Sequence, residues 1–139
     1  MKTYEKKSRT GVYGVAIEEE KILLITQPSG VYKGKLDLPG GGIEYGETIE
    51  EALMREFMEE VAMSFKTMTF LTNLTTTVEE FSFHQIGLIY QVNGLCQVEE
   101  NDHQPHIYEW IPFDVLSQKM VSPFVWRILQ LTHLLKSAG

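Results

Sequence analysis

The segment from Thr48 to Val61 constrains the fold most, because it predicts a helix whose apolar face is bordered by acidic residues. Thr48 precedes Glu51 by three residues, the reciprocal spacing of a capping box, and so marks the start of the helix. At about 100° per residue, the apolar side chains fall on one side. They are Leu53, Phe57, Val61 and Met54, with Ile49 at the border.

Three carboxylates follow one edge of that apolar side. Glu60 falls between Ile49 and Leu53, inside the border of the buried face, whereas Glu56 and Glu59 lie progressively further towards solvent. Like charges at these spacings repel by about 0.2–0.5 kcal/mol per pair at a surface, and partial burial increases the cost. A solvated acidic face is the alternative for a Glu-rich helix. The position of Glu60 instead favours a divalent cation with oxygen ligands, and magnesium suits such a site.

The remaining pattern predicts an α+β fold in which helices pack on a mixed sheet. Asn93-Gly94 predicts a tight hairpin into residues 95–98, and Ser122-Pro123 predicts the cap and first position of a second helix. Residues 38–42 are too rich in glycine for regular structure. No linker or repeat interrupts the chain, so residues 1–139 are predicted to form a single domain. The predicted strands cover residues 11–17, 21–27, 65–71, 81–92 and 109–112, with a turn at residues 18–20.

Charge and cysteine content narrow the function classes. The net charge of −7, from 19 acidic against 12 basic residues, argues against a broad DNA or RNA surface. A polyanionic small substrate suits this charge only if metal ions stand between protein carboxylates and substrate phosphates. Cys96 is the only cysteine, and we expect a small buried hydrophobe in a reducing cytoplasm. The sequence has no run of about 20 apolar residues, so we expect no membrane-spanning helix, and we do not expect the charged first residues to act as a secretory signal because no apolar stretch follows them.

The glycine-rich segment and the acidic helix together resemble the Nudix box. That family pattern is Gly, five residues, Glu, seven residues, Arg-Glu, an apolar residue, any residue, Glu-Glu, any residue, Gly and an apolar residue. This chain has Gly41, Glu47 and Arg55-Glu56-Phe57-Met58-Glu59-Glu60-Val61-Ala62-Met63, so that only Ala62 departs from the pattern. Residues 38–40, Glu44 and Gly46 also resemble the extended form of the motif, and residues 109–112 resemble the family's closing strand.

The resemblance implies an α/β/α sandwich whose mixed sheet has helices on both faces. It also implies hydrolysis of a phosphoanhydride bond in a small nucleoside diphosphate-linked substrate, with Mg²⁺ or Mn²⁺ as cofactor. By position, the metal ligands are Glu56, Glu59, Glu60 and the Gly41 carbonyl. Any one of the three carboxylates is a candidate for the general base, and the sequence leaves the choice open.

Arg55 and Ala62 carry two further expectations about the helix. Arg55 points away from the carboxylates on the helical wheel, and we expect it to pair with Glu51 or Glu47. The resemblance implies that Arg55 orients its neighbours through ion pairs and so belongs to the catalytic group, although a plain helix-stabilising arginine is the alternative. Family members have glycine at the position of Ala62, where a helix often ends with positive φ. We expect the helix to continue instead through Ala62 with negative φ, because Val61 and the residues after it are compatible with helix.

The sequence constrains the substrate less than the chemistry. Subfamilies that cleave ADP-ribose tend to have a proline beyond the box, and those that cleave dinucleoside polyphosphates tend to have a tyrosine near there. This chain has Val78-Glu79-Glu80-Phe81 in that stretch. Enzymes that remove oxidised guanine nucleotides often read the purine with a late asparagine, and no asparagine follows Asn101. By elimination, we expect a small (deoxy)nucleoside triphosphate.

The contacts to substrate and partners are open to several readings. Lys33 and Lys35, in the loop before the glycines, and Glu44 are candidate substrate contacts, although solvated loop lysines are commoner. We expect a small nucleotide as partner, neither a broad nucleic-acid surface nor a membrane, and we leave a homodimer open. A catalytically silent Nudix-fold binding module is the alternative function, and an unrelated metal-binding protein is a third. The retained carboxylates argue against the second, and the spacing from Gly41 to Glu47 argues against the third.

An acidic loop late in the chain holds additional candidates. Glu99, Glu100 and Asp102 stand where some family members supply one more metal ligand, and a solvated acidic loop is the alternative for each. His103 and His106 lack the further ligands and firm spacing of a zinc site, so we interpret them as surface residues or residues at the lip of the substrate site.

Overall fold

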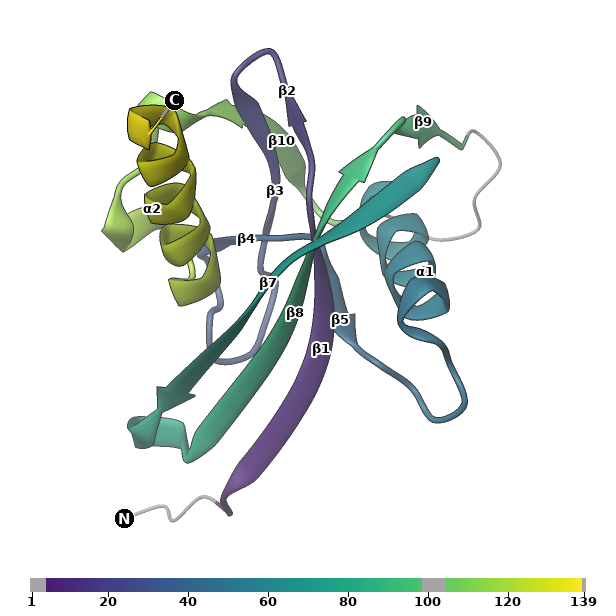
Figure 1. Ribbon diagram of the computed structural model, residues 1–139. Helices are drawn as coiled ribbons and strands as arrows, with labels where there is room; N and C mark the ends of the chain where they lie inside the picture. Colours follow the sequence, from purple (N-terminus) through teal and green to yellow (C-terminus); the bar gives the residue numbers. More distant parts are fainter. Residues whose placement is uncertain (1–4, 99–104, 139) are drawn as a thin grey trace.

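Two helices lie on opposite sides of the paired strands, as Figure 1 shows for α1 (Ile49–Val61) and α2 (Pro123–Ala138). The computed structural model describes residues 5–98 and 105–138. Within them, no helix is long and apolar enough to cross a membrane. Short 3-10 turns cover Glu79–Phe81, Phe113–Val115 and Gln118–Met120. The strands are β1 (Lys7–Val15), β2 (Ile17–Glu18), β3 (Lys21–Thr26), β4 (Leu36–Asp37), β5 (Gly40–Gly42), β6 (Met63–Ser64), β7 (Thr67–Val78), β8 (Phe83–Asn93), β9 (Cys96–Gln97) and β10 (Tyr108–Pro112).

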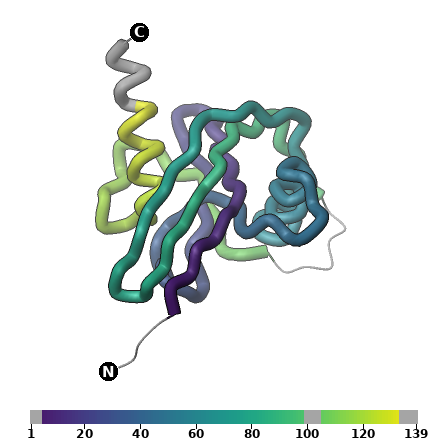
Figure 2. Tube along the Cα trace, turned by 60° about the horizontal axis from the view of Figure 1, so that its bottom comes forward, coloured from purple at the N-terminus to yellow at the C-terminus, as the bar shows by residue number. Residues whose placement is uncertain are grey.

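The largest sheet has the strand order β5-β1-β8-β7 and is mixed. β1 pairs in parallel with β8, whereas β5 pairs antiparallel with β1 and β7 pairs antiparallel with β8. In the tube of Figure 2, the segments of β7 and β8 run side by side, and β1 runs alongside β8. A second sheet has the order β10-β3-β2, with β4 also paired to β3, and β6 pairs with β9. The predicted mixed sheet between two helices is therefore confirmed.

Alternation along the strands divides the core into two layers. Successive side chains of a strand point to opposite faces, so one strand contributes to both layers. In β3, Leu23 and Ile25 pack in the layer that contains Phe57 of α1, whereas Ile22 and Leu24 pack in the layer of α2. All of these side chains are fully buried. The acidic helix is thus held against one face of the sheets by its apolar stripe.

The start of α1 is the capping box that the sequence predicted. Thr48 Oγ1 accepts a hydrogen bond from the Glu51 backbone N–H at 3.1 Å, and the Glu51 carboxylate accepts one from the Thr48 backbone N–H at 3.0 Å. The prediction for Met54 was wrong, because its side chain is 52% exposed and Ala52 takes its place in the apolar stripe. The buried residues of α1 are Ala52, Leu53, Phe57, Glu60 and Val61.

A turn and a cap predicted from single residues are also present. Glu19 and Glu20 have φ of 51° and 62°, which makes the tight turn between β2 and β3. Ser122 caps α2, since its Oγ accepts a hydrogen bond from the Val125 backbone N–H at 3.4 Å, and Pro123 is the first helical residue.

Two segments form more strand than the sequence predicted. Residues 40–42 form β5 with Gly11 opposite Gly42 and Tyr13 opposite Gly40, so the prediction of irregular structure was wrong for residues 40–42, whereas residues 38 and 39 are irregular as predicted. Pairing uses backbone groups alone, so glycine does not prevent it. β7 extends to Val78 rather than ending at Leu71. Its second half is rich in threonine, whose β-branched side chain favours a strand although it adds little hydrophobic signal.

The turn at Asn93 does not produce the predicted hairpin. Gly94 has a φ of 74°, as a tight turn requires, but the following strand β9 pairs with β6 instead of β8. β8 is already paired on one edge with β1 and on the other with β7, which leaves no edge for a third strand. Cys96 in β9 is exposed, so its prediction as a buried hydrophobe was wrong.

Ala62 ends α1 in the left-handed conformation, with φ of 54° and ψ of 41°. The expectation that the helix continues with negative φ was therefore wrong. The reversal at Ala62 directs the chain into β6, and the Ala62 carbonyl accepts a hydrogen bond from the Val98 backbone N–H at 2.9 Å. This pairing with a distant segment outweighs the roughly 1–2 kcal/mol that a left-handed alanine costs.

Replacing Ala62 with glycine should stabilise the protein. Glycine adopts positive φ without the steric cost, and the greater entropy of the unfolded chain offsets part of that gain. We expect Ala62→Gly to raise the free energy of unfolding by about 0.5–1 kcal/mol in urea denaturation. Ala52→Gly, inside the same helix, should lower it and serves as the control. A loss of stability in Ala62→Gly would contradict the left-handed conformation.

Candidate active site

The glycine strand β5 lies directly against the acidic helix and fixes one of its carboxylates. Gly40 has a φ of 145°, and a Cβ there would collide with the backbone of Val12 and Tyr13, so only glycine fits. The Gly40 backbone N–H donates a hydrogen bond to Glu60 Oε2 at 2.9 Å. Glu60 is therefore anchored to the strand although it is a charged residue type within the buried face, as the helical wheel predicted.

Glu60 and Glu56 are both in electrostatically unfavourable positions. Glu60 is 7% exposed, and burial, with smaller contributions from Glu56 and Asp37, raises its pKa to about 9. Burial also raises the pKa of Glu56, against the opposing effect of Arg55. Without a cation beside it, Glu60 is thus protonated at neutral pH. A group with this environment is a candidate for a functional site.

Gly41 gives Glu56 its place against the strand. A Cβ on Gly41 would lie 2.7 Å from Glu56 Oε1 and 2.8 Å from its carboxyl carbon. The absence of a side chain therefore lets the carboxylate approach the β5 backbone. Gly41 and Glu56 therefore line the same pocket, and the role of either as a metal ligand stays a prediction.

Arg55 holds several acidic side chains together. Its Nε and Nη2 donate to the two Glu47 carboxylate oxygens at 2.7 and 3.0 Å, and Nη1 donates to Glu56 at 3.0 Å and to Glu59 at 3.3 Å. The predicted pair with Glu47 is confirmed, whereas the alternative partner Glu51 is used in the helix cap. The prediction that Arg55 points away from the carboxylates was wrong. Glu59 lies one helical turn after Arg55, and residues four apart are neighbours on the surface of a helix, so the two side chains meet.

A pocket of about 320 Å³ lies where the strands face the helix carboxylates, and we call it the carboxylate pocket. Glu56, Glu60, Gly40 and Gly41 line it, whereas Glu59 does not and its side chain is 40% exposed. Within the described residues, no three acidic, histidine or cysteine side chains converge as a complete metal site. Two buried carboxylates and nearby backbone oxygens nevertheless form a hard donor set that fits a divalent cation.

The wall opposite the helix is a chain of hydrogen-bonded polar side chains. The Tyr32 hydroxyl donates to Gln85 Oε1 at 3.2 Å, and Gln85 Nε2 donates to the Tyr13 hydroxyl at 2.8 Å. Burial raises the pKa of each tyrosine to about 12, so both hydroxyls are neutral at physiological pH. Neither Tyr13 nor Gln85 was predicted from the sequence as a site residue. The alternation of side chains along a strand predicts which face of the sheet Tyr13 and Gln85 are on. Nothing in the sequence shows that β1 and β8 are neighbouring strands, so the contact between the two residues could not be predicted.

Asp37 is a buried acid with a structural explanation. It accepts hydrogen bonds from the Leu38 backbone N–H at 2.8 Å, Ser122 Oγ at 2.7 Å and Gln27 Nε2 at 3.0 Å. Burial still raises its pKa, although all three bonds oppose the effect. These bonds join the end of β4 to the start of α2, so Asp37 fixes the floor of the pocket.

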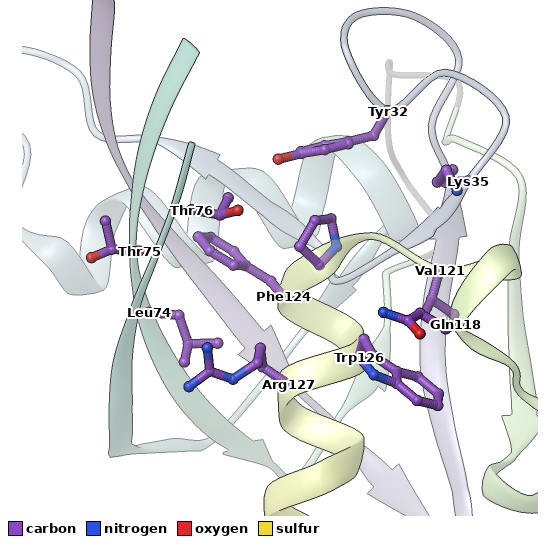
Figure 3. A pocket seen from close by; sticks show the side chains of 11 residues that line it. Tyr32, Lys35, Leu74, Thr75, Thr76, Gln118, Val121, Phe124, Trp126 and Arg127 are labelled. Atoms are coloured by element: carbon purple, nitrogen blue, oxygen red, sulfur yellow. The ribbon is translucent and has the colours of Figure 1, made fainter. Parts of the chain in front are cut away.

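The two predicted lysines are not brought to the carboxylates. Lys33 is exposed and does not line the carboxylate pocket. Lys35 donates to the Lys119 carbonyl at 3.0 Å and lines a separate pocket of about 410 Å³ beside α2, which Figure 3 shows with Phe124 and Tyr32 at its wall. The geometry therefore gives no support to either lysine as a contact for phosphates near the helix.

The structure places Glu44 and His106, whereas the other candidates from the acidic loop late in the chain are not described. Glu44 is exposed, lies 3.7 Å from Arg55 and borders a shallow hollow beside Glu56. The residues Glu99, Glu100, Asp102 and His103 lie outside the described part of the chain. The His106 backbone N–H donates to the Glu60 carbonyl at 2.8 Å, and its Nδ1 is buried with no hydrogen-bond partner among the described residues. His106 thus packs at the end of α1 and is not part of the carboxylate pocket.

Comparison with known proteins agrees with this geometry. The family model of the NUDIX domain matches residues 7–132. The chain is 35% identical over 79 residues to the ADP-ribose pyrophosphatase of Methanocaldococcus jannaschii, which covers 57% of this chain and 47% of that protein. A segment of 32 residues is 59% identical to the nucleoside triphosphatase NudI of Enterobacter sp. strain 638 and covers 23% of each chain. The matches thus span less than half the length of either relative.

The fold agrees over a larger part of the chain. A NUDIX hydrolase from Nitrosomonas europaea superposes with a TM-score of 0.79 at 23% identity, covering 92% of this chain and 90% of that one. At this identity the superposition shows the fold alone. Because the family model spans residues 7–132, the chain belongs to the NUDIX domain family, as the glycine strand and the acidic helix indicated.

Proposed function

We propose that the protein hydrolyses a phosphoanhydride bond in a small nucleoside diphosphate-linked substrate and uses Mg²⁺, or Mn²⁺, as cofactor. One observation carries the proposal: Glu56 and Glu60 face one pocket, both with raised pKa and with Gly40 and Gly41 beside them. A buried pair of this kind is costly without a cation. Glu59, which is half-buried and lies further towards solvent on the same helix, is proposed as the third carboxylate of the set.

The residues of the chain would divide the work of hydrolysis. A magnesium ion held by Glu56, Glu60 and the Gly41 carbonyl would supply charge neutralisation for the phosphates and a more acidic water. One carboxylate of the set would accept the proton of the attacking water as general base. Arg55 would hold Glu56 and Glu59 in position through the bonds described above. Because the pKa of Glu60 is about 9, Glu60 would have to lose its proton to hold a metal ion at neutral pH.

Within this reaction class, we propose a (deoxy)nucleoside triphosphate as the substrate. The absence of the proline and tyrosine signals after the box supports this choice, and one relative is named as a nucleoside triphosphatase. The named activity of the archaeal relative makes ADP-ribose the substrate to compare. Both substrates contain the same type of bond, so the metal chemistry would be shared.

A nucleotide-binding module without turnover is the second candidate. A binding module would have no need of an ionised carboxylate set, whereas this chain retains Glu56, Glu59 and Glu60 together with Arg55. The two functions differ in one simple observation, because a silent module would bind a nucleotide in the presence of Mg²⁺ and release no phosphate or pyrophosphate.

A substrate panel tests the proposed function. Purified protein is incubated with Mg²⁺ and each member of a panel of compounds. The panel contains the common ribonucleoside and deoxyribonucleoside triphosphates, ADP-ribose, a dinucleoside polyphosphate and nucleotide sugars. Products are separated by chromatography, and phosphate and pyrophosphate are assayed. Turnover of a triphosphate that stops with chelator and returns with Mg²⁺ or Mn²⁺ would support the full proposal. Turnover of ADP-ribose alone would retain the reaction class and reject the substrate, and no turnover of any compound would favour the silent module.

Removing either buried carboxylate charge should abolish most of the activity. We expect Glu56→Gln and Glu60→Gln each to lower kcat by about 100-fold or more, because each would remove charge from the site that neutralises the phosphates. Glu50→Gln, an exposed residue of the first turn of the same helix, is the matched control and should retain wild-type kcat. Circular dichroism and melting curves establish that the variants are folded. Near-normal kcat in both buried variants would reject the carboxylates as the catalytic site.

In metal-free protein, buried Glu60 should destabilise the folded state increasingly as the pH rises. Its pKa is about 9 in the folded protein against 4.5 for the ordinary group, so the folded state holds an extra proton between these values. The free energy of unfolding of the wild-type protein therefore falls as the pH rises from 4.5 to about 9. In chelator, the stability of Glu60→Gln relative to wild type should increase from pH 5 to pH 9, as measured by urea unfolding. A difference that stays constant over this range would show that Glu60 titrates normally.

A further inference from the structure

Arg9 has a position unlike that of any other cation near the carboxylates. Both Arg9 and Glu56 line the carboxylate pocket and also the shallow hollow that Glu44 borders. Within the described part of the chain, the Arg9 side chain forms no hydrogen bond and no ion pair. Arg55, by contrast, is bonded to Glu47, Glu56 and Glu59. A cation beside several carboxylates normally pairs with one of them, so the free guanidinium of Arg9 requires an explanation.

The glycine strand gives the Arg9 guanidinium its place. A Cβ on Gly42 would lie 2.9 Å from Nη2, 3.0 Å from Nε and 3.3 Å from Cζ of Arg9, so the guanidinium lies against the bare backbone of β5. Arg9 itself belongs to β1 and is in register with Gln85 of β8. The backbone that carries Arg9 is therefore held by the central sheet, which limits how far the charge can move.

We propose that Arg9 binds the phosphate oxygens of the substrate from the strand side of the carboxylate pocket, opposite the helix. This proposal rests on the proposed function, because it requires a phosphorylated substrate beside Glu56. A guanidinium offers two parallel N–H donors that match two phosphate oxygens, and it remains charged at any physiological pH. In a protein with a net charge of −7, a cation at the pocket also reduces the repulsion of an approaching polyanion.

Two variants separate charge from geometry at this position. Arg9→Gln removes the charge and keeps a polar side chain, whereas Arg9→Lys keeps the charge and loses the paired donors. Lys7→Gln is the matched control, because Lys7 is an exposed cation on the same strand that lines neither hollow beside Glu56. Each protein is measured for kcat and KM with the substrate found in the panel. Each is also titrated calorimetrically with inorganic pyrophosphate in the presence of Mg²⁺, which reports binding without turnover.

The outcomes distinguish phosphate binding from other roles. We expect Arg9→Gln to raise KM and the Kd for pyrophosphate by about 10- to 100-fold with kcat changed far less, Arg9→Lys to lie between, and Lys7→Gln to match wild type. Unchanged Kd and KM in Arg9→Gln, an equal effect of Lys7→Gln, or a loss confined to kcat would each overturn the proposal. If wild-type protein hydrolyses no compound in the panel, the proposed function fails, and the pyrophosphate titration still decides whether Arg9 binds phosphate.

Discussion

The hydrogen bond from the Gly40 backbone to Glu60 is the interaction on which the geometry of the carboxylate pocket depends. It joins β5 to the side of α1 that should otherwise be wholly apolar, and it places a carboxylate where burial raises its pKa to about 9. Glycine is required at position 40 because any side chain would meet the backbone of β1. The sheet therefore determines the position of the glycine, and the glycine determines the position of the acid.

Arg55 and the apolar stripe of α1 support that arrangement in different ways. Leu53, Phe57 and Val61 are fully buried and hold the helix against the strands through an energy that is independent of pH. Arg55 lies on the other side of the carboxylates, where it neutralises part of their mutual repulsion and also donates to the Gly42 carbonyl at 3.0 Å. The helix is thus attached to β5 at both ends of the glycine run, through Glu60 at Gly40 and through Arg55 at Gly42.

Local signals in the sequence were sufficient for the helix, its cap and the burial of Glu60, because these depend on residues within a few turns of one another. The errors at Ala62 and Cys96 have a common physical cause in long-range pairing. Among the described residues, β6 and β9 are short strands that pair only with each other. The glycine of the family pattern pointed to the left-handed end of α1, but the local sequence at Ala62 favoured helix, and the exposed cysteine cannot be inferred without the strand contact. Arg9, Tyr13 and Gln85 were missed for the same reason, since they meet the helix carboxylates only through the order of strands in the sheet. The extent of the domain over residues 1–139 and the metal ligands stay predictions.

The loop between β3 and β4 is closed by hydrogen bonds between the residues at its two ends. The Gln27 backbone N–H donates to the Lys35 carbonyl and the Gly34 N–H donates to the Gln27 carbonyl, each at 2.9 Å. Tyr32, at its tip, forms part of the wall of both the carboxylate pocket and the pocket beside α2. Because these bonds join the two ends of the loop, residues 28–33 can diverge or lengthen without shifting β3 or the glycine strand. Pocket shape can therefore evolve separately from carboxylate placement, and related chains can differ in what they accept while they keep one reactive centre.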